Sequence, residues 1–448
     1  MMKKKLAGLF VCILFITIAI PVAGNANNLF EDYSNKSSFD FLNDGWIDNK
    51  GDIKILHLNG SYYEMGYQHG FLLKDEIEEN IRAFLDFSGK RGFTYEEFLE
   101  IWYIMKNYLP QVYLDELQGI ADGSGLSFDD ISILNIGFFI MINCGSFTAW
   151  GSATIDGKLI HARSSDFSLS VQDPVTGTFI QDNQYLIVRK PGTGYASLAI
   201  AIAGEVGCES GINEKGIGIG MLSSWSRNET QKGIEIGFRV RMVLDNAACD
   251  SEAIGIITSN RTLGYNCILS DGKIPKGYAV ETNADSFYVG TWNTSYESNK
   301  PFTKIIDAVR RANIYVDPAM AASQRENYNP SIFPLLSISL HKNKMGGTNI
   351  SAAGPWTHYV AISKGIKKLW GKMDLNNSMN MLRDVYHGKT DIRFFILQLY
   401  KSYKTVHQWV ACPETGDILV SFASGDRNAF ENPVYYFNLF SLLNDEPC

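Results

Sequence analysis

The chain has 448 residues, of which 45% are hydrophobic and 20% are charged. This composition is typical of a globular protein and excludes a disordered chain, a collagen-like repeat and a long coiled coil. Forty Lys and Arg residues against 48 Asp and Glu residues give a net charge of -8, with no basic block beyond the first few residues. We therefore expect no nucleic-acid partner.

The N-terminus has the order of a secretory signal peptide. Residues 3–5 are lysines, an apolar run extends from Leu6 to Ala23, and small residues follow at Gly24 and Ala26. We expect that residues 1–26 are removed and that the protein is secreted or extracytoplasmic. An uncleaved membrane anchor is the alternative. No later stretch is long and apolar enough to span a bilayer, so we expect no stable membrane span after removal of the signal.

The cysteines and histidines show no metal-binding pattern. Neither the seven cysteines nor the seven histidines have the spacing of metal ligands, and no CxxC pair occurs. We therefore expect no metal ion and no cofactor. Export permits disulfides, but the spacing does not say which cysteines would pair.

The chain divides at Cys144 into a helical part and a strand-rich part. A polar, irregular lead-in extends to about Asp48, and a helical pattern follows from Ser61 to about Gly125. Beyond Cys144, two strand-like segments flank Asp156-Gly157, a two-residue turn signal that predicts a β-hairpin. Further strands are predicted at Gln184–Arg189, Ala196–Ile202, Gly216–Leu222, Gly277–Glu281, His407–Ala411 and Ile418–Ala423, and helices at Ile234–Asn246, Phe302–Tyr315 and Met379–Val385. The pattern indicates an α+β body with much antiparallel sheet.

The hairpin gives a geometric reason to single out Cys144. With a two-residue turn, Arg163 faces Trp150 and Asp166 faces Phe147, so Asp166 lies three residues from Cys144 along the sheet, or roughly 10 Å. A nearby arginine lowers a thiol pKa, and a carboxylate can hold an amine. The alternative is a buried, inert cysteine beside a structural salt bridge.

Several sequence blocks resemble one family. Residues 143–151 (NCGSFTAWG), followed by residues 163–166 (RSSD), resemble the isopenicillin N acyltransferase-like family of N-terminal-nucleophile (Ntn) hydrolases, and bile salt hydrolases share the Cys and the later Arg-x-x-Asp. The resemblance covers nearly everything after residue 55. The other matching blocks are residues 64–70 (EMGYQHG) and 116–123 (ELQGIADG), which resemble propeptide motifs, residues 211–216 (GINEKG), and residues 406–439.

The resemblance implies a fold and a processing step. The fold would be a four-layer αββα sandwich with antiparallel sheets. The precursor would cut itself between Asn143 and Cys144 into a helical segment, residues 27–143, and a catalytic chain, residues 144–448. The two chains would remain associated.

The resemblance also implies a mechanism. The freed α-amine of Cys144 would act as the general base for its own thiol, so that no catalytic histidine is needed. The thiolate would attack a small linear amide or N-acyl compound and form a thioester, which water or an amine would resolve. Asp166 would position the amine, and Arg163 would lie beside the nucleophile.

An oxyanion hole is also required. The family supplies an asparagine from a Thr-Asn block, for which Asn293 in Trp292-Asn293-Thr294 is the best match, although the residue order differs and a glycan at this sequon would exclude catalysis. Further candidates for contact with the substrate or the oxyanion are Asn213 and Ser223, which stands where bile salt hydrolases carry an asparagine. Arg311 matches a family arginine or belongs to a solvated helix face.

Two alternatives remain at this level. A papain-like cysteine protease would need Gln at position 138, where the chain has Phe, and a histidine about 130–150 residues after the cysteine, which is absent. A secreted protein that keeps the Ntn fold as a binding module without activity is the second. The intact Cys144, Arg163 and Asp166 favour an enzyme, whereas Ser223 leaves room for the inactive form.

Overall fold

The computed structural model describes residues 44–137, 143–325, 340–342, 348–350, 353–399 and 404–446, which all belong to one unit, Phe41–Cys448. The predicted signal peptide and Cys448 lie outside the described residues. Among the helices of the described ranges, none combines the length and the apolar character that a membrane span requires.

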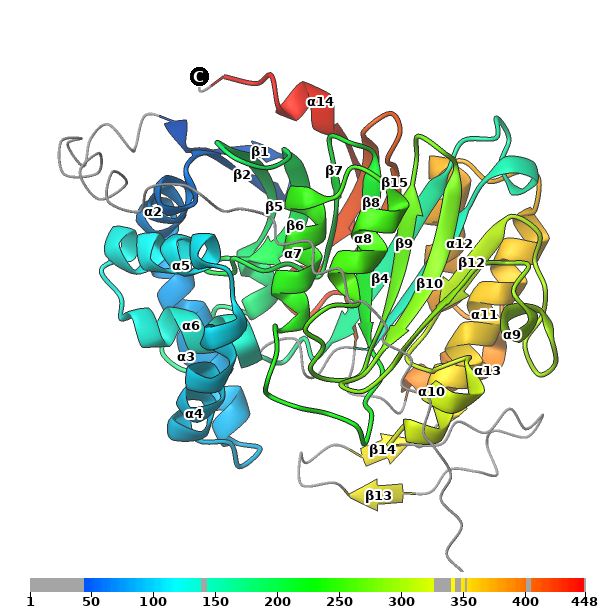
Figure 1. Ribbon diagram of the computed structural model, residues 1–448, viewed down its shortest axis with the longest axis horizontal. Coiled ribbons are helices and arrows are strands. Elements are labelled where there is room, and N and C mark those ends of the chain that lie inside the picture. Colours follow the sequence, from blue (N-terminus) through cyan, green and yellow to red (C-terminus); the bar gives the residue numbers. More distant parts are fainter. Residues whose placement is uncertain are drawn as a thin grey trace, which may run out of the picture. The chain divides into compact units, whose positions relative to one another are not determined.

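Nine strands form the larger sheet, in the order β1-β2-β5-β6-β7-β8-β9-β10-β11 (Figure 1). Neighbours in this sheet run antiparallel, except for β2 and β5, which run parallel. The strands are β1 (Trp46–Lys50), β2 (Ile53–Gly60), β5 (Gln184–Pro191), β6 (Ser197–Ile202), β7 (Ser210–Asn213), β8 (Ile217–Ser223), β9 (Tyr265–Asp271), β10 (Lys276–Thr282) and β11 (Phe287–Gly290).

Six antiparallel strands form the second sheet, in the order β12-β3-β4-β15-β16-β17. They are β3 (Asn143–Ala149), β4 (Ile160–Phe167), β12 (Ala308–Arg311), β15 (Lys404–Cys412), β16 (Asp417–Phe422) and β17 (Tyr435–Asn438). A separate pair consists of β13 (Leu340–Lys342) and β14 (Thr348–Ile350).

The two sheets face each other, and helices cover both outer faces. Strand β3 contacts β8 and β9 across the interior. Helices α7 (Ile236–Asn246) and α8 (Asp250–Ile257) pack on the larger sheet, and α11 (Ala353–Leu369) and α12 (Leu375–Tyr386) pack on the smaller one, with α13 (Ile392–Leu399) against α11 and α12 (Figure 1). The predicted four-layer αββα architecture of the α+β class is confirmed. Three short helices are α9 (Ser295–Ser298), α10 (Pro318–Ser323) and α14 (Leu439–Leu442).

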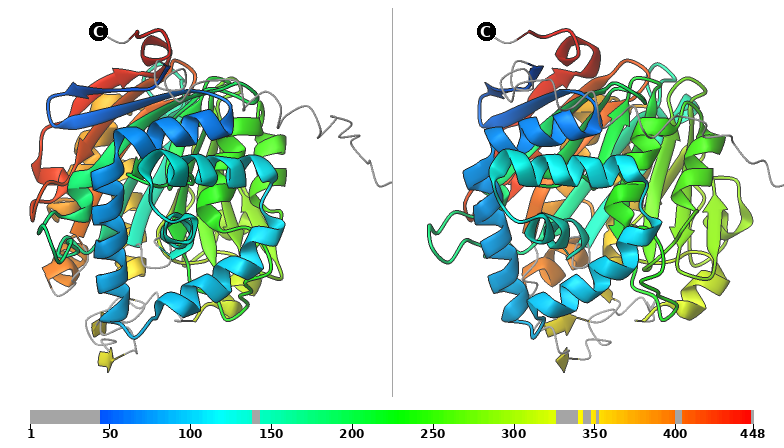
Figure 2. Two further views of the ribbon diagram at one scale, coloured as in Figure 1. Left: turned by 90° about the vertical axis from the view of Figure 1, so that its left-hand side faces the viewer. Right: turned by 60° about the vertical axis from the view of Figure 1, so that its left-hand side comes forward.

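The N-terminal segment is helical as predicted, but it also supplies two strands. Its five helices gather on one side of the sandwich (Figure 2). They are α2 (Tyr62–Leu72), α3 (Lys74–Gly89), α4 (Tyr95–Met105), α5 (Gln111–Ser124) and α6 (Phe128–Gly137). The irregular lead-in expected up to Asp48 is wrong in its last residues, because β1 begins at Trp46 and β2 follows. Strand β1 is a polar edge strand, and its exposed side chains give no alternating hydrophobic pattern.

The connection between β3 and β4 differs from the predicted two-residue turn. Residues 150–159 form a longer loop that contains the 3-10 turn η4 (Gly151–Ala153), in which the N–H of Gly151 donates to the carbonyl of Gly157. Consequently Arg163 lies opposite Ser146, and Asp166 lies opposite Asn143. The predicted register is wrong, and the true register brings Asp166 next to Cys144.

The predicted helix at Phe302–Tyr315 is also wrong. Part of it is β12, which pairs with β3 at the edge of the smaller sheet. Arg310 and Arg311 have separate buried partners, Ser363 for Arg310 and Glu281 for Arg311. The charged pair thus belongs to a buried strand, where strand alternation separates the two side chains, and not to a solvated helix face.

Helices α2 and α5 approach so closely that glycines are required at the contact. A Cβ added to Gly66 would lie 2.1 Å from the carbonyl oxygen of Glu116, and one added to Gly119 would lie 2.2 Å from that of Tyr63. Both obstacles are backbone atoms, which cannot rotate away. The two glycines belong to the sequence blocks at residues 64–70 and 116–123, so these blocks encode a close helix–helix contact.

We expect Gly66→Ala to lower the free energy of unfolding by about 1–3 kcal/mol, because the added methyl group overpacks a backbone contact. Urea unfolding followed by circular dichroism measures the change. Gly89→Ala, at the end of α3 where a Cβ meets nothing within 4 Å, is the matched control and should not destabilise the protein. Equal unfolding midpoints for the two variants would contradict the packing argument.

Candidate active site

Cys144 is the second residue of β3 and is completely buried. Its Sγ accepts a hydrogen bond of 3.1 Å from Nη2 of Arg163. Its backbone N–H donates to Oδ1 of Asn313 at 3.0 Å. The thiol and the backbone nitrogen of the same residue are therefore each held by a separate buried side chain.

Arg163 is fully buried between the two sheets and donates in four directions. Besides Cys144, it reaches the carbonyl of Met221 through Nε at 2.9 Å and Oε2 of Glu209 through Nη1 at 2.7 Å. Nη1 also lies 2.8 Å from Nε2 of His407. Because arginine only donates, Nε2 of His407 accepts, which places the imidazole proton on Nδ1, 3.0 Å from Oε1 of Gln184.

Charges around Arg163 keep the cluster balanced. Burial, with the Arg163 charge adding to it, lowers the pKa of His407 to about 3, so this ring is neutral. Burial by itself would raise the pKa of Glu209, but the charge of Arg163 and the hydroxyl of Ser165 lower it below its usual value. Glu209 is therefore the anion that compensates Arg163.

Burial keeps the thiol of Cys144 protonated. Burial raises its pKa to about 12, although Arg163 and a hydrogen bond from the backbone of Asp166 act in the opposite direction. The thiolate form, which is the nucleophile, therefore needs a base that accepts the thiol proton.

Asp166 lies beside the nucleophile at the end of β4. It pairs in register with Asn143, and its Oδ2 accepts a hydrogen bond of 3.0 Å from the hydroxyl of Tyr386 on α12. Burial, and next the charge of Asp166, raise the pKa of Tyr386 well above its usual value, so its hydroxyl stays protonated and donates. Sequence reasoning did not find Tyr386.

Asn313 is a second residue that sequence reasoning missed. It follows β12, and its Nδ2 donates to the carbonyl of Ser223 at 2.7 Å. Asn266 fixes the backbone on both sides of it by donating to the carbonyls of Ala312 and Ile314 at 2.8 and 2.7 Å. The sequence predicted a helix over this segment, and this prediction hid Asn313. Its one signal in the sequence would have been a polar residue at the edge of an apolar strand.

Among the other candidates, Asn293 and Asn213 have positions or partners elsewhere, whereas Ser223 is hydrogen-bonded to Asn313, which holds the N–H of Cys144. Asn293 is exposed in the turn between β11 and α9. Asn213 caps α7 by donating from Nδ2 to the carbonyls of Leu244 and Ala247. Ser223 contributes its carbonyl to Asn313.

Arg311 belongs to a separate buried ion cluster. Its Nε donates to Oε1 of Glu281 at 3.0 Å, and its Nη1 donates to Oε2 of Glu297 at 2.8 Å. Both carboxylates are buried, so the guanidinium is committed to joining β12, β10 and α9. This arrangement gives Arg311 a structural role.

Neither metal ligands nor disulfides occur in the part of the chain that the structure describes. No group of three or more His, Cys, Asp or Glu side chains in these residues could hold a metal ion. The described cysteines other than Cys144 are free thiols at Cys208, Cys249, Cys267 and Cys412.

A pocket opens beside the cluster around Arg163. It is small and shares Glu209 and His407 with that cluster. Its apolar walls are Phe167, Ile180, Ile200, Ala201, Ile202 and Val406. Since Phe167 directly follows Asp166, the pocket lies next to the hairpin that carries the nucleophile.

We expect Glu209→Ala to lower the free energy of unfolding by about 3–5 kcal/mol, because it leaves Arg163 buried without its anion. Glu214→Ala is the matched control, because Glu214 pairs with Lys215 on the surface and its loss should cost less than about 1 kcal/mol. Denaturant unfolding measures both. A loss for Glu209→Ala no larger than that for the control would show that Arg163 does not depend on this carboxylate.

Comparisons with known proteins agree with the resemblance in the sequence. The model of the acyl-coenzyme A:6-aminopenicillanic acid acyl-transferase family matches residues 163–352. An uncharacterized protein from Archaeoglobus fulgidus is 29% identical over 62% of this chain and 52% of its own length, and rat (Rattus norvegicus) acid ceramidase is 25% identical over 40% and 55%. The chain thus spans about half the length of these relatives.

Among solved structures, a mutant conjugated bile acid hydrolase from Clostridium perfringens is 14% identical, with a TM-score of 0.36 over 66% of this chain and 96% of that chain. Over residues 163–352, the chain is similar to the acyl-coenzyme A:6-aminopenicillanic acid acyl-transferase family, in agreement with the resemblance in the sequence.

Proposed function

We propose that the protein is an exported cysteine Ntn-hydrolase that cleaves a small linear amide or N-acyl compound, or transfers its acyl group, through a thioester on Cys144. One observation carries this proposal. Both reactive atoms of Cys144 are held in place, the sulfur by Arg163 at 3.1 Å and the nitrogen by Asn313 at 3.0 Å. An inert buried cysteine has no need for partners on both atoms. Export rests on the signal-like residues 1–26.

The first step of the proposal is self-cleavage. The thiol of Cys144 attacks the carbonyl carbon of Asn143, the C–N bond breaks, and the nitrogen of Cys144 takes the thiol proton and becomes an amine. Water then hydrolyses the resulting thioester, which leaves a carboxylate on Asn143 and a free thiol on Cys144. Asn313 already accepts a hydrogen bond from the nitrogen that becomes the α-amine.

The second step is turnover by the new N-terminus. The neutral α-amine, whose ordinary pKa is about 7.7–8.0, takes the proton from the thiol, while the charge of Arg163 stabilises the thiolate. The thiolate attacks the substrate carbonyl, and the α-ammonium returns the proton to the leaving amine. Water or a second amine then resolves the thioester and regenerates the thiol.

The substrate class follows from the pocket and from a relative. The apolar side chains that line the pocket next to Asp166 would favour an apolar acyl group over a charged one. Acid ceramidase, one of the relatives, is by its name an enzyme that acts on ceramide. An N-acyl compound with an apolar acyl chain is therefore the substrate we propose.

We expect the wild-type protein to appear as two chains on a denaturing gel, the larger beginning at Cys144, and Cys144→Ala to remain one chain. Cys249→Ala is the control, because the thiol of this half-buried cysteine lies 3.1 Å from Oγ of Ser251 and has no part in the site, so its loss should not affect cleavage. N-terminal sequencing identifies the cut, and N-acyl amino acids of increasing chain length test turnover. An uncut wild-type protein without turnover would favour the inactive binding module.

Association of the two chains after cleavage rests on a buried ionic cluster between them. Glu116 of α5 pairs with Arg241 of α7 at 3.1 Å, and Arg241 also pairs with Asp245. The hydroxyls of Tyr62 and Tyr113, on α2 and α5, both donate to Oδ2 of Asp245. This cluster therefore links the N-terminal helices to the catalytic chain.

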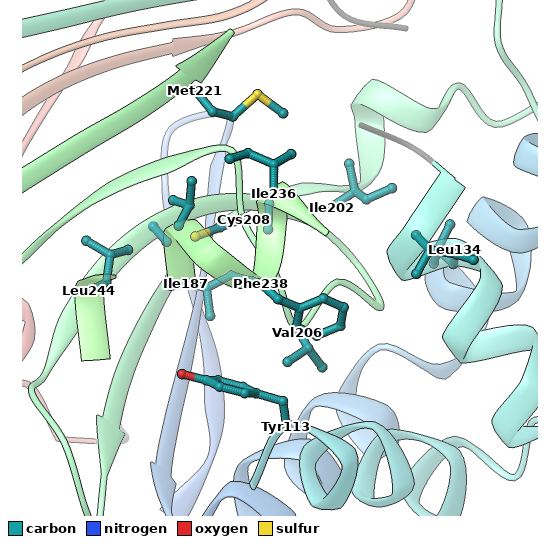
Figure 3. Packing of buried hydrophobic residues seen from close by; sticks show 14 of the residues in the cluster. Tyr113, Leu134, Ile187, Ile202, Val206, Cys208, Met221, Ile236, Phe238 and Leu244 are labelled. Carbon is teal, nitrogen blue, oxygen red and sulfur yellow. The ribbon is translucent and has the colours of Figure 1, made fainter. Parts of the chain in front are cut away.

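Apolar packing surrounds the ionic cluster. Tyr113 from α5 and Leu134 from α6 lie in the same buried core as Val206 and Phe238 (Figure 3). The rings of Tyr113 and Phe238 are 6.1 Å apart. Because this core contains residues from both predicted chains, cutting one peptide bond at its edge leaves it intact, and we propose that the chains stay together.

We expect Glu116→Ala to weaken the association of the cleaved chains by about 3–5 kcal/mol, because the buried charge of Arg241 loses a partner. Size-exclusion chromatography of cleaved protein in increasing urea gives the midpoint of chain separation. Gln118→Ala, on the exposed face of the same helix, is the control and should keep the wild-type midpoint. Equal midpoints for the two variants would contradict the proposed role of the cluster.

A further inference from the structure

Two side chains from the outer helical layer reach the hairpin at Cys144 from the side opposite Arg163. Tyr386 is the last residue of α12, and its hydroxyl lies 3.0 Å from Oδ2 of Asp166. His358 of α11 places its Nε2 3.3 Å from the same hydroxyl. Both side chains are buried, and neither belongs to the residues that the sequence pattern singled out.

His358 also lies against the backbone next to the nucleophile. A Cβ added to Gly145 would be 2.5 Å from Nε2 of His358 and 2.7 Å from Ile362. The glycine that follows Cys144 in the sequence block therefore leaves room for this imidazole. Its ring stacks on Phe394, with centroids 4.3 Å apart, which fixes its plane.

The hydrogen bonds that link His358, Tyr386 and Asp166 all run in one direction. The Tyr386 hydroxyl has a single proton, which it donates to the carboxylate of Asp166, so its oxygen accepts from Nε2–H of His358. The chain runs from His358 through Tyr386 to Asp166, and each bond polarises the next toward the carboxylate. Asp166 is thereby oriented on the face of the hairpin away from Arg163.

We propose that Tyr386 is a positioning residue for Asp166, that His358 holds the Tyr386 hydroxyl in place, and that the pair sets how Asp166 meets the α-amine of Cys144. This inference rests on the proposed function, in which Asp166 positions that amine. In this proposal, Asp166 is held by side chains from the outer helices α11 and α12 and not only by its neighbours in the strands.

The groups that face this chain are few among the described residues. Tyr386 meets Asp166 and Ser164 from β4, His358 from α11, and the rings of Phe394 and Phe430, and the thiol of Cys144 is close enough to act on its pKa. His358 meets Tyr386 from α12, Phe394 from α13 and the backbone of Gly145 from β3. The one charged group among these contacts is Asp166, so the hydroxyl of Tyr386 acts mainly on this carboxylate.

The test compares cleaved wild-type protein with Tyr386→Phe, which keeps the ring and removes the hydroxyl. We expect kcat on an N-acyl amino acid to fall about 10- to 100-fold with KM within about twofold, because a hydrogen bond to a charged group is lost. The acidic limb of the pH profile should move to higher pH, since loss of a donor favours the protonated carboxylate. Tyr278→Phe, which removes a hydrogen bond from a tyrosine of β10 to Asp250 of α8, should keep wild-type values.

A second pair of variants tests His358. His358→Gln retains an N–H donor at a comparable position and should keep most of the activity, whereas His358→Phe keeps the stacking but should behave like Tyr386→Phe. Thermal unfolding of all variants shows that they are folded. Activity and pH profiles of Tyr386→Phe that coincide with wild type, or an equal loss in Tyr278→Phe, would overturn the proposal.

Alkylation of Cys144 by iodoacetamide separates this inference from the proposed function, because it needs no substrate. Its rate is measured against pH by peptide mass spectrometry. In one outcome, Tyr386→Phe shifts the pH dependence of the alkylation rate, but wild type turns over no amide. The proposed function then fails and the positioning role stands. If the two alkylation profiles coincide, the positioning role fails whatever the turnover.

Discussion

The arrangement of the side chains around Cys144 depends on one completely buried arginine. Arg163 lies between two sheets where an unpaired charge would be costly, so every nitrogen of its guanidinium needs a partner. Glu209 supplies the compensating charge, and Met221 supplies a carbonyl oxygen. The remaining donor points at Sγ of Cys144. The position of Cys144 therefore depends on the need of one buried cation, Arg163, for hydrogen-bond partners.

The hairpin that carries Cys144 is supported from both faces. The inner face has Arg163 with Glu209, and the outer face has Asp166 with Tyr386. Burial keeps the thiol protonated, so its reactivity waits for a base. This arrangement agrees with the mechanism that we propose. In that mechanism the site is closed and inactive before cleavage, and cleavage supplies the base.

The N-terminal helices take part in the same core as the strand-rich part of the chain. Glycines let α2 and α5 meet backbone to backbone, which brings Glu116 to Arg241. Strands β1 and β2 extend the larger sheet, so the segment also shares main-chain hydrogen bonds with β5. The boundary at Cys144 thus divides the chain in sequence but not the folded core.

Local signals in the sequence were sufficient for the hairpin, the helical N-terminal segment and the spacing of Cys144, Arg163 and Asp166, because these depend on neighbours along the chain. The register was missed, since the loop of residues 150–159 is held by Asp307, which is far away in sequence. Asn313 was missed for a similar reason. It follows β12, a short edge strand, and the sequence around the two arginines of this strand predicted a helix.

The sequence by itself determined the fold class and singled out Cys144, Arg163 and Asp166 as candidates, because periodicity, turn residues and matching sequence blocks are local properties. Only the tertiary structure decided which distant side chains surround them. Glu209, Asn313 and Tyr386 come from three different layers and carry no motif of their own. Packing of the two sheets and the outer helices brings them around the hairpin of Cys144, where Glu209 compensates Arg163, Asn313 accepts from Cys144 and Tyr386 donates to Asp166.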